Sequence, residues 1–193
     1  MEKEQLSHQQ SIDLIMNMVN QSKYNIAQDK VIYLMWGYSV ALSSLVHYGL
    51  QFIMDVPANQ AWYIWLLMPV LGIINSIYFS RKKKDQNAKT FTDRALGAVW
   101  ISFIAALITF IAASPAVGWQ TIYPIFMVLY GIGSACSGGI LKFKPLIYGG
   151  ALSMFLGLIS FYQVFEVQLL LLPLAITISF VVPAHMLPKN KTV

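Results

Sequence analysis

The chain has 193 residues, of which 57% are hydrophobic and only 11% are charged. Soluble domains carry about 25% charged residues, so a globule of this composition could not cover its surface with polar groups. An apolar, aperiodic chain with one cysteine also excludes intrinsic disorder, a coiled coil, collagen and a disulfide scaffold, which leaves an integral membrane protein.

Residues 1–30 are polar and precede the first apolar run. Ser7 followed by Gln10 has the form of a capping box at a helix start. Apolar residues then recur at helical spacing, at Ile12, Ile15, Met16, Val19 and Ile26. This pattern predicts an amphipathic helix over 8–28 that lies in the headgroup region or packs under the bundle. A docking surface for a cytoplasmic protein partner is the alternative.

Six charge-free apolar runs follow, at about 31–54, 61–80, 96–113, 121–141, 145–164 and 167–187. A helix of roughly 20 residues crosses a hydrocarbon core of about 30 Å. Barrel strands would alternate apolar and polar residues, whereas these runs are continuous. The sequence therefore predicts an all-α polytopic membrane protein, in which six transmembrane helices form three hairpins over 31–187. Residues 188–193 would form a short tail.

The orientation follows from the basic residues. With six spans, all 13 Lys and Arg residues lie on one side, and the opposite loops carry only Asp55 and Glu166. Lys and Arg are retained on the cytoplasmic side, so we expect a multi-pass protein of the cell membrane with both termini in the cytoplasm. The basic run Arg81–Lys84 would attract anionic lipid headgroups, and nucleic-acid binding is not expected.

In the first span, polar residues recur at every fourth position and form a polar stripe along one face of the helix. Such a face should turn away from lipid, where hydrogen-bonding groups find no water. His47 is the functional candidate, because ionisable groups inside a membrane usually serve a task; a structural hydrogen bond to a neighbouring helix is the alternative. We expect Asn75 and Ser76 of the second span to be its partners. The stripe consists of Ser39, Ser43, His47 and Gln51, with Ser44 adjacent.

Small residues recur at four-residue intervals in the fourth and fifth spans. Such faces let helix backbones approach closely, which drives packing in lipid. We therefore expect a tight hairpin, closest near Gly131 or Gly139; the alternative is that the glycines line a pore. The two faces are Gly131, Ala135 and Gly139, and Gly149, Ser153 and Gly157.

Several signatures of chemistry are missing from the sequence. No Asp or Glu lies within a span, which argues against the carboxylate relays of proton-driven pumps. No His, Cys and Asp residues have metal-ligand spacing, and neither a nucleophile elbow nor a zinc-protease motif is present. The sequence thus predicts a protein that is not an enzyme and has no cofactor or metal.

Three stretches resemble those of a family of small six-span bacterial membrane proteins whose activity is uncharacterised. They are Leu34–Gly37, Tyr130–Gly133 and Ser137–Ile147. The resemblance implies the six-span fold and brings no activity with it. Two functions remain open: a non-catalytic sensor or accessory subunit that acts through its bundle and cytoplasmic helix, and a small transporter or channel around His47. Self-association as a homodimer is also expected.

Overall fold

The computed structural model of the protein describes residues 30–82 and 91–187. The described residues are all-helical, with 91% in helices and no strand among them. The prediction of an all-α protein is therefore confirmed. The expected amphipathic helix over 8–28 and the tail 188–193 lie outside the described residues.

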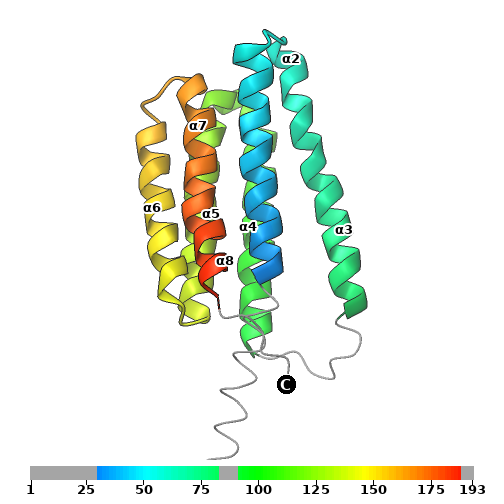
Figure 1. The fold of residues 1–193 in the computed structure, drawn as a ribbon, viewed down its shortest axis with the longest axis vertical. Coiled ribbons are helices and arrows are strands. Elements are labelled where there is room, and N and C mark those ends of the chain that lie inside the picture. The colour runs from blue at the N-terminus through cyan, green and yellow to red at the C-terminus, as the bar shows by residue number, and fades with distance from the viewer. Residues whose placement is uncertain (1–29, 83–90, 188–193) are drawn as a thin grey trace, which may run out of the picture.

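The helices follow one another with short connections (Figure 1). The first helix covers residues 30–48 and continues as the π-helix η1 (Gly49–Ile53). Two of the long helical rods are made of three consecutive elements each. The first of these rods (58–82) contains α2 (Ala58–Ala61), η2 (Trp62–Leu66) and α3 (Leu67–Lys82). Then come α4 (Phe91–Val117), α5 (Trp119–Ile140) and α6 (Lys144–Ser160), and the last rod contains α7 (Phe165–Ile176), η4 (Thr177–Val181) and α8 (Val182–Met186).

Four helices have the length and apolar composition needed to cross a membrane. They are Ala58–Ile77, Phe91–Val117, Trp119–Ile140 and Phe165–Met186. Helix α6 is also apolar but has 17 residues. The four helices support the prediction of a membrane protein.

The first helix and the last rod are antiparallel neighbours. The hydroxyl of Tyr48 donates to Glu166 at 3.3 Å, and the hydroxyl of Tyr38 lies 2.9 Å from Nε2 of His185. Next to Tyr38, a β-carbon placed at Gly37 would lie 2.7 Å from Val181. The chain is thereby closed into a bundle in which its first and last helices touch along their length (Figure 1).

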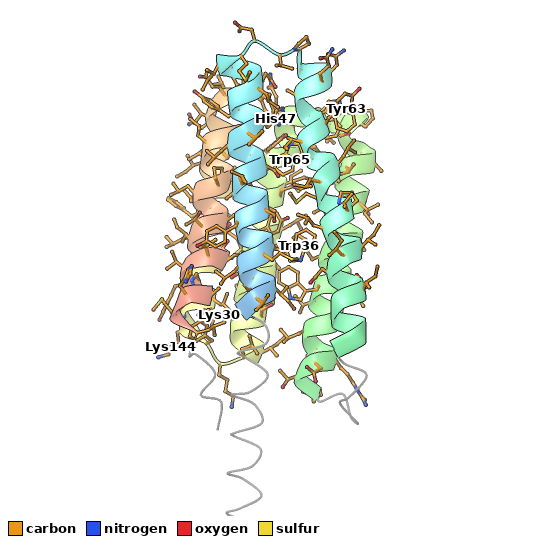
Figure 2. The ribbon with its side chains drawn as sticks, turned by 45° about the vertical axis from the view of Figure 1, so that its right-hand side comes forward. Lys30, Trp36, His47, Tyr63, Trp65 and Lys144 are labelled. Atoms are coloured by element: carbon orange, nitrogen blue, oxygen red, sulfur yellow. The ribbon has the colours of Figure 1, made fainter. Side chains whose placement is uncertain are left out.

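The charged residues of the described part lie at the two ends of the bundle. Lys30 and Lys144 lie at one end, which we call the basic end (Figure 2). Lys142 lies two residues before Lys144, and both Asp93 and Arg94 lie in the first turn of α4. Asp55, in the loop after η1, and Glu166, in the first turn of α7, lie at the other end, the acidic end. More than half of α5 and of the last rod is buried, whereas almost none of the 58–77 helix and α4 is. The core therefore lies around α5 and the last rod.

Helices α5 and α6 meet through small residues, as the spacing predicts, but the residues of α6 that face α5 differ in part from the predicted ones. A β-carbon at Gly131 would lie 2.6 Å from the carbonyl oxygen of Gly150, and one at Gly150 would collide with the carbonyl of Gly131 and come within 3.0 Å of Ala135. Further along, Ser153 donates to the carbonyl of Met127 at 2.9 Å, and Gly157 approaches Pro124.

Two glycines of the predicted faces lie elsewhere. Gly139 faces open space, so the closest approach lies at Gly131 and not at Gly139. Gly149 faces the last rod, where a β-carbon would lie 2.5 Å from the carbonyl oxygen of Ile178. Consecutive positions of a helix differ by about 100°, because a turn takes 3.6 residues. Gly150 therefore takes the α5 side, and Gly149 takes the side of η4.

The last rod contains two prolines that lack the N–H group of a helical hydrogen bond. Each leaves the carbonyl four residues earlier without its helical donor. These two carbonyls accept serine hydroxyls from other helices instead. Before Pro173, the carbonyl of Leu169 accepts from Ser44 at 2.7 Å. Before Pro183, the carbonyl of Ser179 accepts from Ser134 at 2.8 Å.

Candidate functional site

The polar stripe of the first helix faces the interior of the bundle. Ser43, Ser44 and His47 are buried, with exposed fractions of 2%, 0% and 3%. Ser39 and Gln51 are half-buried. An inward stripe is what the cost of polar groups against lipid demands. The stripe continues to the acidic end, and His47 lies in the half of the first helix nearest that end (Figure 2).

The ring of His47 accepts a hydrogen bond from the 58–82 rod. Nε1 of Trp65 donates to Nδ1 of His47 at 2.9 Å, and the hydroxyl of Tyr123 lies 3.1 Å from the same nitrogen. An indole N–H is only a donor, so Nδ1 carries no proton in this arrangement. His47 is therefore neutral with its proton on Nε2, and the Tyr123 hydroxyl lies within hydrogen-bond distance of Nδ1.

Aromatic rings surround His47 on three sides. The ring centroids of Trp65, Tyr123 and Phe165 lie 6.4, 6.3 and 5.8 Å from that of His47. Tyr123 and Phe165 also pack edge to face at 5.0 Å. We call these four residues the His47 cluster. Its members come from the first helix, η2, α5 and α7, so one buried side chain joins four helical segments.

The expected partners Asn75 and Ser76 do not contact His47. Asn75 is half-buried and Ser76 exposed on α3, and the ten residues between Trp65 and Asn75 correspond to about 15 Å of helix. The reason is the antiparallel pairing, which places Trp36 against Gly72 and His47 opposite Trp65. Reflection of residue 47 about the centre of the observed loop at 54–57 leads to position 64, next to Trp65. The loop that the sequence predicts, 55–60, would lead to position 68, which is within one helical turn of Trp65.

Polar atoms without normal partners lie near the His47 cluster. Gln51, one turn beyond His47, lies beside the imidazole ring, but its buried Oε1 makes no hydrogen bond of normal geometry within the described residues. A residue that the sequence did not single out, Gln168 of α7, is 2% exposed. Its amide nitrogen donates to the carbonyls of Ser160 and Gln163 at 3.1 Å each, and so closes the end of α6.

The side chains of the His47 cluster offer hydrogen bonding and proton binding. No group of three or more His, Cys, Asp and Glu residues that could hold a metal occurs in 30–82 and 91–187. Cys136 is a free thiol exposed on α5. Comparisons with protein-family models, with curated proteins and with solved structures found no match. The function therefore has to be argued from the site itself.

Proposed function

We propose that the chain is a six-span protein of the bacterial inner membrane with both ends in the cytoplasm. The four long apolar helices support this topology, as do the first helix and α6, which run antiparallel to their neighbours over apolar sequence. The basic end would face the cytoplasm and the acidic end the outside, in keeping with the retention of Lys and Arg on the cytoplasmic side. The three expected hairpins belong to the same proposal.

Within this topology, we propose that the protein is a non-catalytic sensor or accessory subunit. The observation that carries this proposal is the burial of His47, whose Nδ1 accepts the N–H of Trp65 and lies 3.1 Å from the Tyr123 hydroxyl. An ionisable side chain in that position reports on how four helical segments are arranged. Only 3% of the His47 side chain is exposed, and this burial argues against a water-filled path at that residue. The polar segment 1–30 would carry the output on the cytoplasmic side.

A small transporter or channel is the second candidate, and one observation favours it. Three buried side-chain oxygen atoms without hydrogen-bond partners in the described residues belong to the acidic half of the bundle, namely Oε1 of Gln51, Oε1 of Gln168 and Oγ of Ser160. A fourth, Oγ of Ser137, lies near the opposite end of α5. Buried acceptors of this kind normally have a partner. In a transporter they would face water or a polar solute during part of its cycle.

The two functions are separated by conductance and flux. The full-length protein is reconstituted into planar bilayers and into vesicles that contain the pH dye pyranine, with K⁺, Na⁺, Cl⁻ and proton gradients as probes. A sensor or accessory subunit should add no conductance or proton flux above protein-free membranes. A flux that His47→Ala abolishes and His185→Ala preserves would overturn the proposal and favour the transporter.

A further inference from the structure

We propose that His47 is a proton-operated latch, which holds the 58–82 rod against the bundle while the imidazole is neutral and releases it when the imidazole is protonated. The inference rests on the proposed sensor function and names its signal as a proton from the acidic end. Its geometry is the meeting of Trp65, His47 and Tyr123 in one hydrogen-bonded group.

The latch needs an unprotonated Nδ1. Trp65 and Tyr123 both approach this nitrogen, at 2.9 and 3.1 Å, and the indole can only donate. A proton added to Nδ1 turns the acceptor into a donor that faces the Trp65 N–H, which cannot accept a hydrogen bond, whereas the Tyr123 hydroxyl can accept the new N–H. The hydrogen bond from Trp65 is then lost, and a charge is left among the rings of Trp65, Tyr123 and Phe165. The hydrogen bond that holds Trp65 therefore needs the neutral ring, and proton binding favours arrangements in which Trp65 has moved away.

The 58–82 rod is the part of the bundle that a small change can move. Along α3, Val70, Ile73, Ile74 and Ile77 are each at least half exposed. Close packing of the rod on the first helix occurs at Trp65 and at Gly72, where a β-carbon would lie 3.7 Å from Trp36. The two helices diverge from the acidic end toward the basic end in both views (Figures 1 and 2). Segments with little buried area open at low free-energy cost.

The other ionisable side chains around the cluster are phenols and carboxylates. The phenols are Tyr123 of α5 and Tyr63 of η2. Glu166 of α7 is exposed and accepts from Tyr48, and Asp55 lies in the loop. As carboxylates, Glu166 and Asp55 would attract the protonated ring toward the acidic end.

The first test follows Trp65 by fluorine NMR. The full chain is labelled with 5-fluorotryptophan in lipid nanodiscs, and Trp65→Phe assigns the resonance. Between pH 8 and pH 5 the Trp65 resonance should move with a one-proton dependence. His47→Asn keeps an acceptor close to the place of Nδ1 but cannot titrate, so its resonance should stay at the pH 8 position. His8→Asn combined with His185→Asn is the matched control and should leave the titration unchanged.

The second test measures the movement itself. Spin labels at Leu42→Cys and Ile73→Cys, both on exposed positions, are introduced in a Cys136→Ser background. The distance between the labels should lengthen from pH 8 to pH 5, and it should stay short in His47→Asn. If His47→Asn fails to fold, Trp65→Phe is measured in its place, since this variant removes the N–H donor to His47 and keeps an aromatic ring. The distance between the two labels in Trp65→Phe should be long already at pH 8.

A stationary Trp65 resonance, a titration that persists in His47→Asn, or a label distance that does not change with pH would each overturn the latch. These measurements are made in nanodiscs and depend neither on cellular topology nor on flux. A protein without conductance whose Trp65 does not titrate would keep the proposed function and lose the latch. A protein with His47-dependent flux would lose the proposed function, whatever the behaviour of Trp65.

Discussion

The pairing of Ser134 with Pro183 predicts an energetic coupling between two residues on different helices. Ser134 of α5 is fully buried, and its hydroxyl donates to the carbonyl of Ser179 at 2.8 Å. That carbonyl lacks the α-helical N–H donor four residues further on, because position 183 is proline. Ser134→Ala should therefore leave one buried acceptor without a partner. In Pro183→Ala, the new N–H group can donate to the same carbonyl, and the serine becomes dispensable.

The magnitude follows from counting acceptors. The Ser134 hydroxyl also lies 3.0 Å from the carbonyl of Leu146, but that carbonyl keeps its helical donor at Gly150. One acceptor is thus lost, and a buried unsatisfied group costs about 1–3 kcal/mol. Hydrogen bonds between membrane helices average about 0.6 kcal/mol and reach about 1.7. We expect Ser134→Ala to lower the free energy of unfolding by about 1.5 kcal/mol, and by under about 0.5 kcal/mol in the Pro183→Ala background.

The assay is reversible unfolding in mixed micelles, followed by circular dichroism, for the four proteins of the double-mutant cycle. Ser153→Ala is the matched control. Its hydroxyl donates to the carbonyl of Met127, which keeps the N–H group of Gly131 as a helical donor. This variant should cost less than Ser134→Ala and show no coupling to Pro183. An equal cost of Ser134→Ala with and without Pro183 would refute the reasoning, since the serine would then not replace the missing donor.

Two further predictions concern topology and packing. Asn59→Cys and Gly118→Cys should react with a membrane-impermeant thiol reagent added outside intact cells, whereas Gln86→Cys should not; the reverse pattern would invert the proposed orientation. Gly150→Ala should lower the free energy of unfolding by about 2 kcal/mol, because the added methyl group meets backbone atoms of α5. Gly139 faces open space, so Gly139→Ala should leave the free energy of unfolding unchanged. Equal effects of the two glycine substitutions would contradict the described packing.

The sequence predicted those features that depend on one helix alone. Helical class follows from continuous apolar runs, and the inward direction of Ser43 and His47 follows from the cost of polar groups against lipid. These arguments need the period of the helix and nothing about its neighbours. The small residues of the fourth and fifth spans likewise predicted a close contact, which lies at Gly131 and Gly150.

Features that depend on two helices were less accessible. The partner of His47 required the register of the first hairpin, and a shift of ten residues separates Asn75 from Trp65. Whether Gly149 or Gly150 meets α5 is decided by a rotation of about 100°, which a spacing of four residues does not fix. The donors for the carbonyls of Leu169 and Ser179 lie on helices far away in the chain. Their identification requires knowing which helices are neighbours.

The contact between the first and last helices also sets the order in which the protein can be completed. Ser44 and the Leu169 carbonyl that accepts its hydroxyl are 125 residues apart. At a synthesis rate of about 5–20 residues per second, the partner of Ser44 leaves the ribosome roughly 6–25 s after Ser44 itself. During that interval the polar stripe of the first helix has no last rod to face. Until α7 is made, the first helix must therefore lie beside the insertion machinery or other early spans. A nascent chain that stops before α7 exposes this polar stripe, by which quality control can recognise it.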